Sequence, residues 1–169
     1  MEWAEFSIAL AVFLGSHVIP VRFRAPLIAR LGKRGYVAAY SALSLGLLYW
    51  LIVASARAPY AELWPHEPWM RWLVNLAMPL AVLAAATAGM AGLMAAFALW
   101  AGAHLVANGD VAHAVFFGLL LAYALFGLAI CLRRGVTLNL GWPRLLAAAL
   151  VWAALFHLHP LVIGVSPMP

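Results

Sequence analysis

Apolar residues form six long runs along the chain, separated by short stretches that are polar or charged. A membrane-spanning helix needs about 20 mostly apolar residues. The runs are continuously apolar and lack the alternation that strands of a membrane barrel show. The pattern therefore predicts an all-α protein, an integral membrane bundle of about six transmembrane helices. The expected spans are Trp3–Pro20, Tyr36–Ala56, Arg71–Ala88, Gly92–Asn108, Val111–Leu132 and Arg144–Gly164.

The third and fourth spans come from one uncharged stretch, from Trp72 to Asn108. As a single helix this stretch would be ~55 Å long, well beyond the ~30 Å of a hydrocarbon core. Two spans joined by a tight turn at Gly89-Met90-Ala91-Gly92 fit better, because glycine adopts the backbone angles that such a turn requires. Five spans with one re-entrant segment stay open as the alternative.

Composition supports a membrane protein and excludes other classes. Of the 169 residues, 67% are hydrophobic and 9% are charged, whereas a soluble domain has roughly 45–50% and about 25%. So little polar surface cannot cover a water-facing globule, which excludes soluble, fibrous and disordered proteins. The length predicts one domain over residues 1–169. The single cysteine, Cys131, excludes an internal disulfide.

The distribution of charge predicts an orientation in the membrane. Eight of the ten basic residues fall in two loops on one side: Arg22, Arg24, Arg30, Lys33, Arg34, Arg133, Arg134 and Arg144. All five acidic residues fall on the other side: Glu2, Glu5, Glu62, Glu67 and Asp110. Basic loops face the cytoplasm, so both termini are expected on the non-cytoplasmic side. We interpret the net charge of +5 as setting this orientation, with no nucleic-acid partner.

Histidines are the candidate functional groups of the spans. An ionisable side chain inside a membrane is costly, so its presence is a functional hypothesis. His17 lies in the first span, His104 in the fourth and His159 in the sixth. Neutral imidazole is a common ligand of metals and of heme iron. Histidines on separate helices of a bundle therefore indicate a bound cofactor.

The alternative is that an imidazole hydrogen-bonds to a neighbouring carbonyl or reaches the membrane interface. We favour this interpretation for His66 and His113. His157 and His159 are two residues apart on one helix and cannot both face its interior, and we favour His159 as the inward one. The sequence has no glycine-rich phosphate loop, zinc-ligand spacing or paired carboxylates in the spans.

Several segments resemble the NnrU family of bacterial membrane proteins, and the resemblance extends over nearly the whole chain. The most specific segment is Leu99–Asp110, which contains Trp100-Ala101-Gly102-Ala103-His104. Other matching segments are Phe13–His17, Ala58–Trp64 and Leu158–Pro167. The resemblance implies a multi-pass protein of the bacterial cytoplasmic (inner) membrane, with a role in denitrification through nitric oxide or nitrite metabolism.

The NnrU family is in turn similar to zeta-carotene isomerase, a membrane protein that binds heme b through two histidines. Matched motif by motif, those ligands fall on His17 and His104, so the resemblance implies heme b with these two residues on its iron. Two departures stand out. Ala101 occupies the place of a cysteine that exchanges as a ligand in the isomerase. Met90-Ala91-Gly92 replaces an Arg-His-Pro motif that family members usually carry.

The expected depths of the histidines in the membrane suggest a second possible pair of heme ligands. His17 is expected near the inner end of its span and His104 in the outer half of its own, so their depths differ by roughly 10–20 Å. Axial nitrogens on one heme lie only about 4 Å apart. By depth alone His104 pairs better with His159, which is therefore a third candidate ligand.

Three functions follow as expectations. The first is an NnrU-like protein of nitric oxide or nitrite metabolism that binds heme b. The second is a heme-dependent cis-trans isomerase of a polyene such as a carotenoid. The third is a non-enzymatic transporter or an accessory protein of a membrane complex, so enzymatic activity stays open. The expected partners are the lipid bilayer and either another membrane protein or a second copy of the chain.

Overall fold

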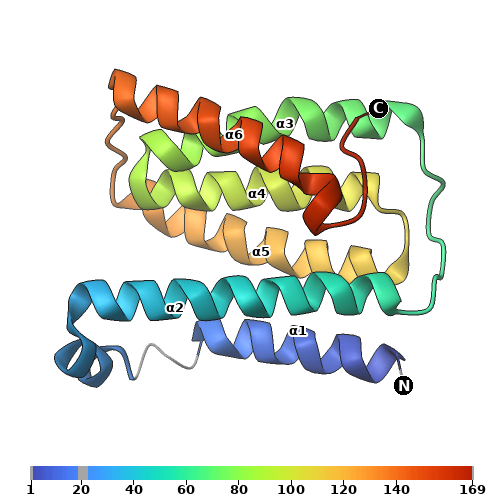
Figure 1. Ribbon diagram of the computed structural model, residues 1–169, viewed down its shortest axis with the longest axis horizontal. Coiled ribbons are helices and arrows are strands. Elements are labelled where there is room, and N and C mark those ends of the chain that lie inside the picture. The colour runs from blue at the N-terminus through green and yellow to red at the C-terminus, as the bar shows by residue number, and fades with distance from the viewer. Residues whose placement is uncertain (1, 19–22, 169) are drawn as a thin grey trace. The chain divides into compact units, whose positions relative to one another are not determined.

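The computed structural model describes residues 2–18 and 23–168, which fold into six helices (Figure 1). The predicted all-α class is confirmed. Pro20, the expected end of the first span, and Arg22 of the first basic loop lie outside the described residues. The helices are α1 Glu2–Val18, α2 Arg24–Arg57, α3 Pro68–Thr87, α4 Gly89–Ala107, α5 Val111–Arg133 and α6 Trp142–Val162.

Five of these helices, α2 to α6, are long and apolar enough to cross a membrane. The chain is therefore a multi-pass membrane protein. The remaining helix, α1, has 17 residues, about 25 Å at 1.5 Å per residue. That α1 also crosses the bilayer, and that both termini face away from the cytoplasm, stay predictions.

The predicted division of the uncharged stretch into two helices is confirmed. Only Ala88 separates α3 from α4, so the turn is shorter than expected and Met90, Ala91 and Gly92 belong to α4. Gly89 has a φ of 56°, which favours glycine because it lacks a Cβ. A Cβ on Gly92 would collide with the carbonyl oxygen of Ala84. The two helices thus pack backbone against backbone, as small residues allow in membranes.

The contacts divide the chain into two compact units, Met1–Tyr60 and Ala61–Pro169. In the first unit α1 packs antiparallel to α2 (Figure 1). The Glu5 carboxylate accepts a hydrogen bond from Trp50 Nε1 at 3.4 Å and lies 3.6 Å from the Arg57 guanidinium. Near the opposite end, the Tyr40 hydroxyl donates to the Ser16 carbonyl at 3.2 Å. Polar contacts thus hold this helix pair at both ends.

The start of α2 differs from the prediction. α2 begins at Arg24, and its residues before Gly32 make most of the stretch expected as a basic loop helical, whereas the stretch after Gly32 begins close to Tyr36, where the span was expected. Its one break is Gly32, whose φ of 69° and ψ of 162° are not helical. Alanine, leucine and arginine are strong helix formers, so the charged residues are helical on both sides of the break, and the interruption falls at a glycine.

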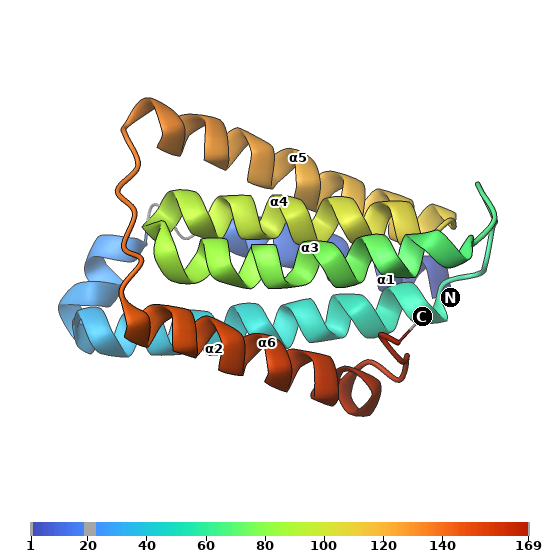
Figure 2. The same cartoon turned by 90° about the horizontal axis from the view of Figure 1, so that it is seen from above.

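In the second unit α3 packs against both α4 and α6, and α4 packs against α5. Figures 1 and 2 show α4 and α6 running in the same direction, both antiparallel to α3. The last turns of α4 and α6 therefore lie at the same end of this unit. At the other end, Arg144 donates to the Ala86 carbonyl at 3.0 Å and Asn139 N to the Thr87 carbonyl at 2.8 Å. These bonds satisfy terminal carbonyls of α3.

The contact at Gly92 gives a test of this packing. We expect Gly92→Ala to destabilise the protein by about 1–3 kcal/mol, because the new methyl group forces α3 and α4 apart. The measurement is thermal unfolding of the detergent-purified protein, followed by tryptophan fluorescence. The matched control is Gly118→Ala on α5, where a Cβ would meet no atom within 4 Å. Equal stability of the two variants would contradict the close packing.

Candidate functional site

The imidazole of His104 lies half-buried in the last turn of α4. Its ring centroid is 5.5 Å from that of Trp100 and 5.3 Å from that of Phe117. Its Nδ1 lies 2.9 Å from the Trp100 carbonyl oxygen. A carbonyl only accepts hydrogen bonds, so Nδ1 is the donor and Nε2 carries the lone pair. Within the described residues, Nδ1 is the only ring nitrogen of His104 that has a hydrogen-bond partner.

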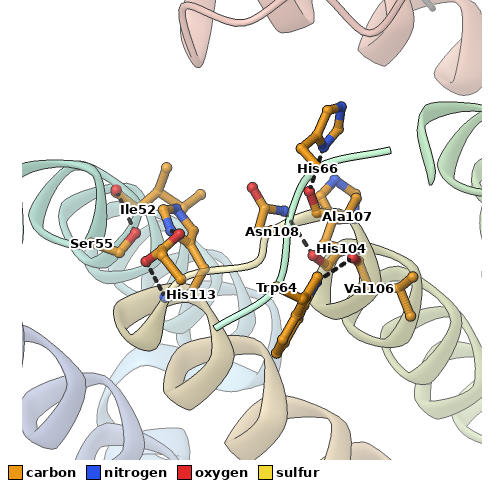
Figure 3. Close-up of polar contacts among 10 residues, drawn as sticks. Ile52, Ser55, Trp64, His66, His104, Val106, Ala107, Asn108 and His113 are labelled. Carbon is orange, nitrogen blue, oxygen red and sulfur yellow. Dashed lines mark hydrogen bonds and ion pairs between the residues drawn. The ribbon is translucent and has the colours of Figure 1, made fainter. Parts of the chain in front are cut away.

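The segment before α3 closes over the end of α4 (Figure 3). Trp64 donates from Nε1 to the Val106 carbonyl at 3.0 Å and from its backbone N to the Gly109 carbonyl at 3.2 Å. Asn108 donates from Nδ2 to the His104 carbonyl at 2.7 Å. Val106 belongs to the last turn of α4, whose carbonyls have no partner within the helix, whereas the His104 carbonyl also accepts from the backbone N of Asn108 at 3.0 Å. The turn of α4 that carries His104 is therefore held by Trp64 from the segment before α3 and by Asn108 from the segment after α4.

His66 and His113 both have protein partners, as we favoured from the sequence. The Nδ1 of His66 donates to the Ala107 carbonyl at 3.1 Å, and its Nε2 accepts from Arg71 Nε at 3.3 Å. His113 Nδ1 lies 2.6 Å from Asp110 Oδ2. The other oxygen of Asp110 accepts from the backbone N of His113, which makes Asp110 the N-cap of α5. His66 thus ties the segment before α3 to the end of α4, and His113 contacts the N-cap residue of its own helix.

His159 occupies the last turn of α6. It is half-buried, whereas His157 is exposed. Its Nδ1 lies 2.6 Å from the Val165 carbonyl oxygen, which ties the helix to the segment that follows it. The last turn of α4, the last turn of α6 and the first turn of α5, which carry His104, His159 and His113, lie at the same end (Figures 1 and 2). The structure thus brings these three histidines to one end of the second unit.

The histidines at this end do not form a metal site with several protein ligands. Among residues 2–18 and 23–168, no group of three or more histidine, cysteine, aspartate or glutamate side chains could hold a metal ion. A heme differs from such a site, since the porphyrin supplies four ligands and the protein supplies only the axial ones. The residues to consider for a heme are therefore single imidazoles with an available nitrogen.

His17 lies in the last turn of α1, in the first unit. Its Nδ1 lies 2.8 Å from the Phe13 carbonyl oxygen and 3.1 Å from Ser16 Oγ. Its ring centroid is 4.5 Å from that of Phe13 and 5.9 Å from that of Tyr40. His17 therefore repeats the local arrangement of His104: Nδ1 bonds to the carbonyl of an aromatic residue four positions earlier. That the two histidines share one heme stays a prediction.

Two polar contacts at the histidine end of the second unit were not predicted from the sequence. Asn75 Nδ2 donates to the Pro167 carbonyl at 2.7 Å, and Arg71 donates to the Met168 carbonyl at 3.3 Å. These bonds hold the C-terminal segment against α3. The residues involved lie more than 90 positions apart in sequence, so no local pattern reports the contact. The N-cap at Asp110 did have a local signal, since Asn-Gly-Asp before an apolar run is typical of a turn and a cap.

The apolar helices and the charge pattern define a multi-pass helical membrane protein whose second unit carries a cluster of histidines at one end. The sequence profile of the family described as NnrU protein matches residues 5–167. The chain belongs to the NnrU family. No curated protein and no solved structure gives a significant match.

The N-cap of α5 is open to a direct test. We expect Asp110→Ala to lower stability by about 0.5–2 kcal/mol, because the first turn of α5 loses its side-chain acceptor. Asp110→Asn is the control, since asparagine caps equally well but cannot pair ionically with His113. Thermal unfolding in detergent compares the three proteins. If both variants lost the same stability, the ion pair rather than the cap would be responsible.

Proposed function

We propose that this NnrU protein binds heme b with His104 as an axial ligand and acts in nitric oxide or nitrite metabolism. One observation carries the proposal. The Nδ1–H of His104 is bound to the Trp100 carbonyl, which leaves Nε2 as the basic nitrogen. Metal-ligating histidines have this arrangement, since a carbonyl on the second nitrogen fixes the tautomer and the ring orientation and raises the basicity of the ligand.

The surroundings of His104 suit an apolar, planar group. Trp100 and Phe117 flank the imidazole, and Phe116 stacks on Phe117 with ring centroids 4.5 Å apart. Aromatic side chains keep water away from the imidazole and pack well against flat rings. When bound, the heme would supply a redox-active iron on which nitric oxide or nitrite chemistry can take place. The protein positions Nε2 of His104 and excludes water from the site.

The second axial ligand has two candidates. The family resemblance favours His17, whose Nδ1 is held by the Phe13 carbonyl in the same way. Position favours His159, which lies at the same end of the second unit as His104. The Nδ1 of His159 donates to the Val165 carbonyl, so its Nε2 is likewise the basic nitrogen. We propose His17, with His159 as the alternative that the experiment distinguishes.

We do not extend the proposal to polyene isomerisation. Ala101 stands where the related isomerase has its exchanging cysteine, and it is completely buried. Its methyl group offers no donor atom, so a ligand exchange at this position has no partner. The residues in place of the Arg-His-Pro motif, Met90-Ala91-Gly92, are part of α4 and carry no charge. These two departures favour a role in nitric oxide or nitrite metabolism over isomerisation.

The heme proposal predicts an absorption spectrum. The full-length protein, expressed with added heme precursor and purified in detergent, should show a Soret band. In His104→Ala the band should shrink or shift, because the iron loses an axial nitrogen. His157→Ala is the matched control, since His157 is exposed on α6 and should leave the spectrum unchanged. Of His17→Ala and His159→Ala, only the variant that removes the second ligand should alter the band.

A rescue experiment separates ligation from a packing effect. In His104→Gly, added imidazole should restore the wild-type spectrum if the side chain acts as a ligand, and should do nothing if it only fills space. Wild-type protein without a Soret band would overturn heme binding. A normal band in His104→Ala would overturn the assignment of His104.

The physiological role has its own test. In a strain that lacks the gene and grows on nitrite without oxygen, we expect nitric oxide or nitrite to accumulate above the wild-type level. Wild-type and His157→Ala genes should restore consumption, while His104→Ala should not. Restoration by His104→Ala would show that the role does not depend on this imidazole.

A further inference from the structure

The first part of α2 does not belong to its membrane-spanning part. Gly32 has φ 69° and ψ 162°, so the helical residues Arg24–Leu31 end there and a second helical stretch runs on to Arg57. Figure 1 shows the chain before Gly32 curling aside at the N-terminal end of α2 instead of continuing its axis. The stretch after Gly32 has about 25 residues and is roughly 37 Å long. It can cross the hydrocarbon core without the residues before the break.

We call residues 24–34 the basic segment, because they carry Arg24, Arg30, Lys33 and Arg34. All four side chains are exposed. None of them has an ion-pair partner within the part of the chain that the structure describes. Between Glu5 and Glu62 the sequence has no acidic residue, and Glu5 is engaged by Arg57 and Trp50. These positive charges therefore require counterions from outside the unit.

The basic segment also has an apolar side. Leu27, Ile28 and Leu31 follow the i, i+1, i+4 spacing of one helix face. Leu27 is 38% exposed and Leu31 is 52% exposed, so the fold of this unit leaves part of both side chains uncovered. A short helix with an apolar face and several cations is typical of segments that lie in the plane of a membrane interface.

We propose that Arg24–Leu31 lies on the bilayer surface and that the cations of the basic segment, including Lys33 and Arg34 at the start of the spanning stretch, bind the head groups of anionic phospholipids. Leu27 and Leu31 reach into the boundary between head groups and acyl chains, while Arg30, Lys33 and Arg34 contact the phosphates. The break at Gly32 lets the chain turn from the membrane plane into the spanning helix. Anionic lipid is the partner that the charge selects, because each basic residue near such a surface adds attraction and a zwitterionic surface offers none.

The test compares lipids on the full-length protein. Protein purified in a neutral detergent is titrated with short-chain phosphatidylglycerol or phosphatidylcholine, and bound lipids are counted by native mass spectrometry. We expect the wild type to prefer phosphatidylglycerol, with a preference that weakens as salt is added. In Arg30→Gln/Arg34→Gln the preference should fall by about fivefold or more, from the loss of two charges near the head groups.

Two further variants separate this site from general charge effects. Arg133→Gln/Arg134→Gln removes the same charge at the end of α5 and should keep most of the preference. Gly32→Ala keeps every charge but places a Cβ at a φ of 69°, which favours a straight helix and should reduce the preference. The proposal is overturned if Arg30→Gln/Arg34→Gln binds lipids like the wild type. It is also overturned if both double variants lose the preference equally, since the attraction would then lie in net charge alone.

Discussion

Polar groups inside a bilayer must find their partners within the protein, and this constraint organises the structure. It acts most strongly where helices end. The terminal carbonyls of α4 receive hydrogen bonds from Trp64 and His66. Those of α3 receive them from Arg144 and Asn139. Loop residues that look like ordinary surface residues in the sequence are therefore the groups that allow these helices to stop where they do.

The same constraint distinguishes the histidines by how their ring nitrogens are hydrogen-bonded within the protein. His66 uses both ring nitrogens within the protein, and His113 is tied to the carboxylate that caps its own helix. His104 binds the protein through Nδ1 and keeps Nε2 as a base inside an aromatic environment. A histidine that is only half satisfied at such a position is costly unless a ligand completes it. This difference in hydrogen bonding between His104 and the other two histidines, rather than the mere presence of histidine, supports a ligand site at His104.

Length and hydropathy were sufficient to predict the helices, because the hydrocarbon core limits how long an apolar run can be. The division between α3 and α4 followed from this limit. The start of α2 did not, because the charge of Arg30, Lys33 and Arg34 suggests a loop, whereas these residues are helical on either side of the break at Gly32. At the site, the aromatic residue four positions before His17 and His104 is visible in the sequence. The bond between Trp64 and Val106 joins residues 42 positions apart, and only the folded chain reveals it.

The joint between α3 and α4 has a consequence for how the protein is made. One residue separates the two helices. The region from Trp72 to Asn108 contains no Asp, Glu, Lys or Arg that would favour keeping either helix in water. A connection of one residue is too short for one helix to enter the bilayer while the other stays in water. We expect α3 and α4 to leave the ribosome-bound insertion machinery together as a preformed hairpin. The packing of α3 against α4 would then form before α5 and α6 have been synthesised.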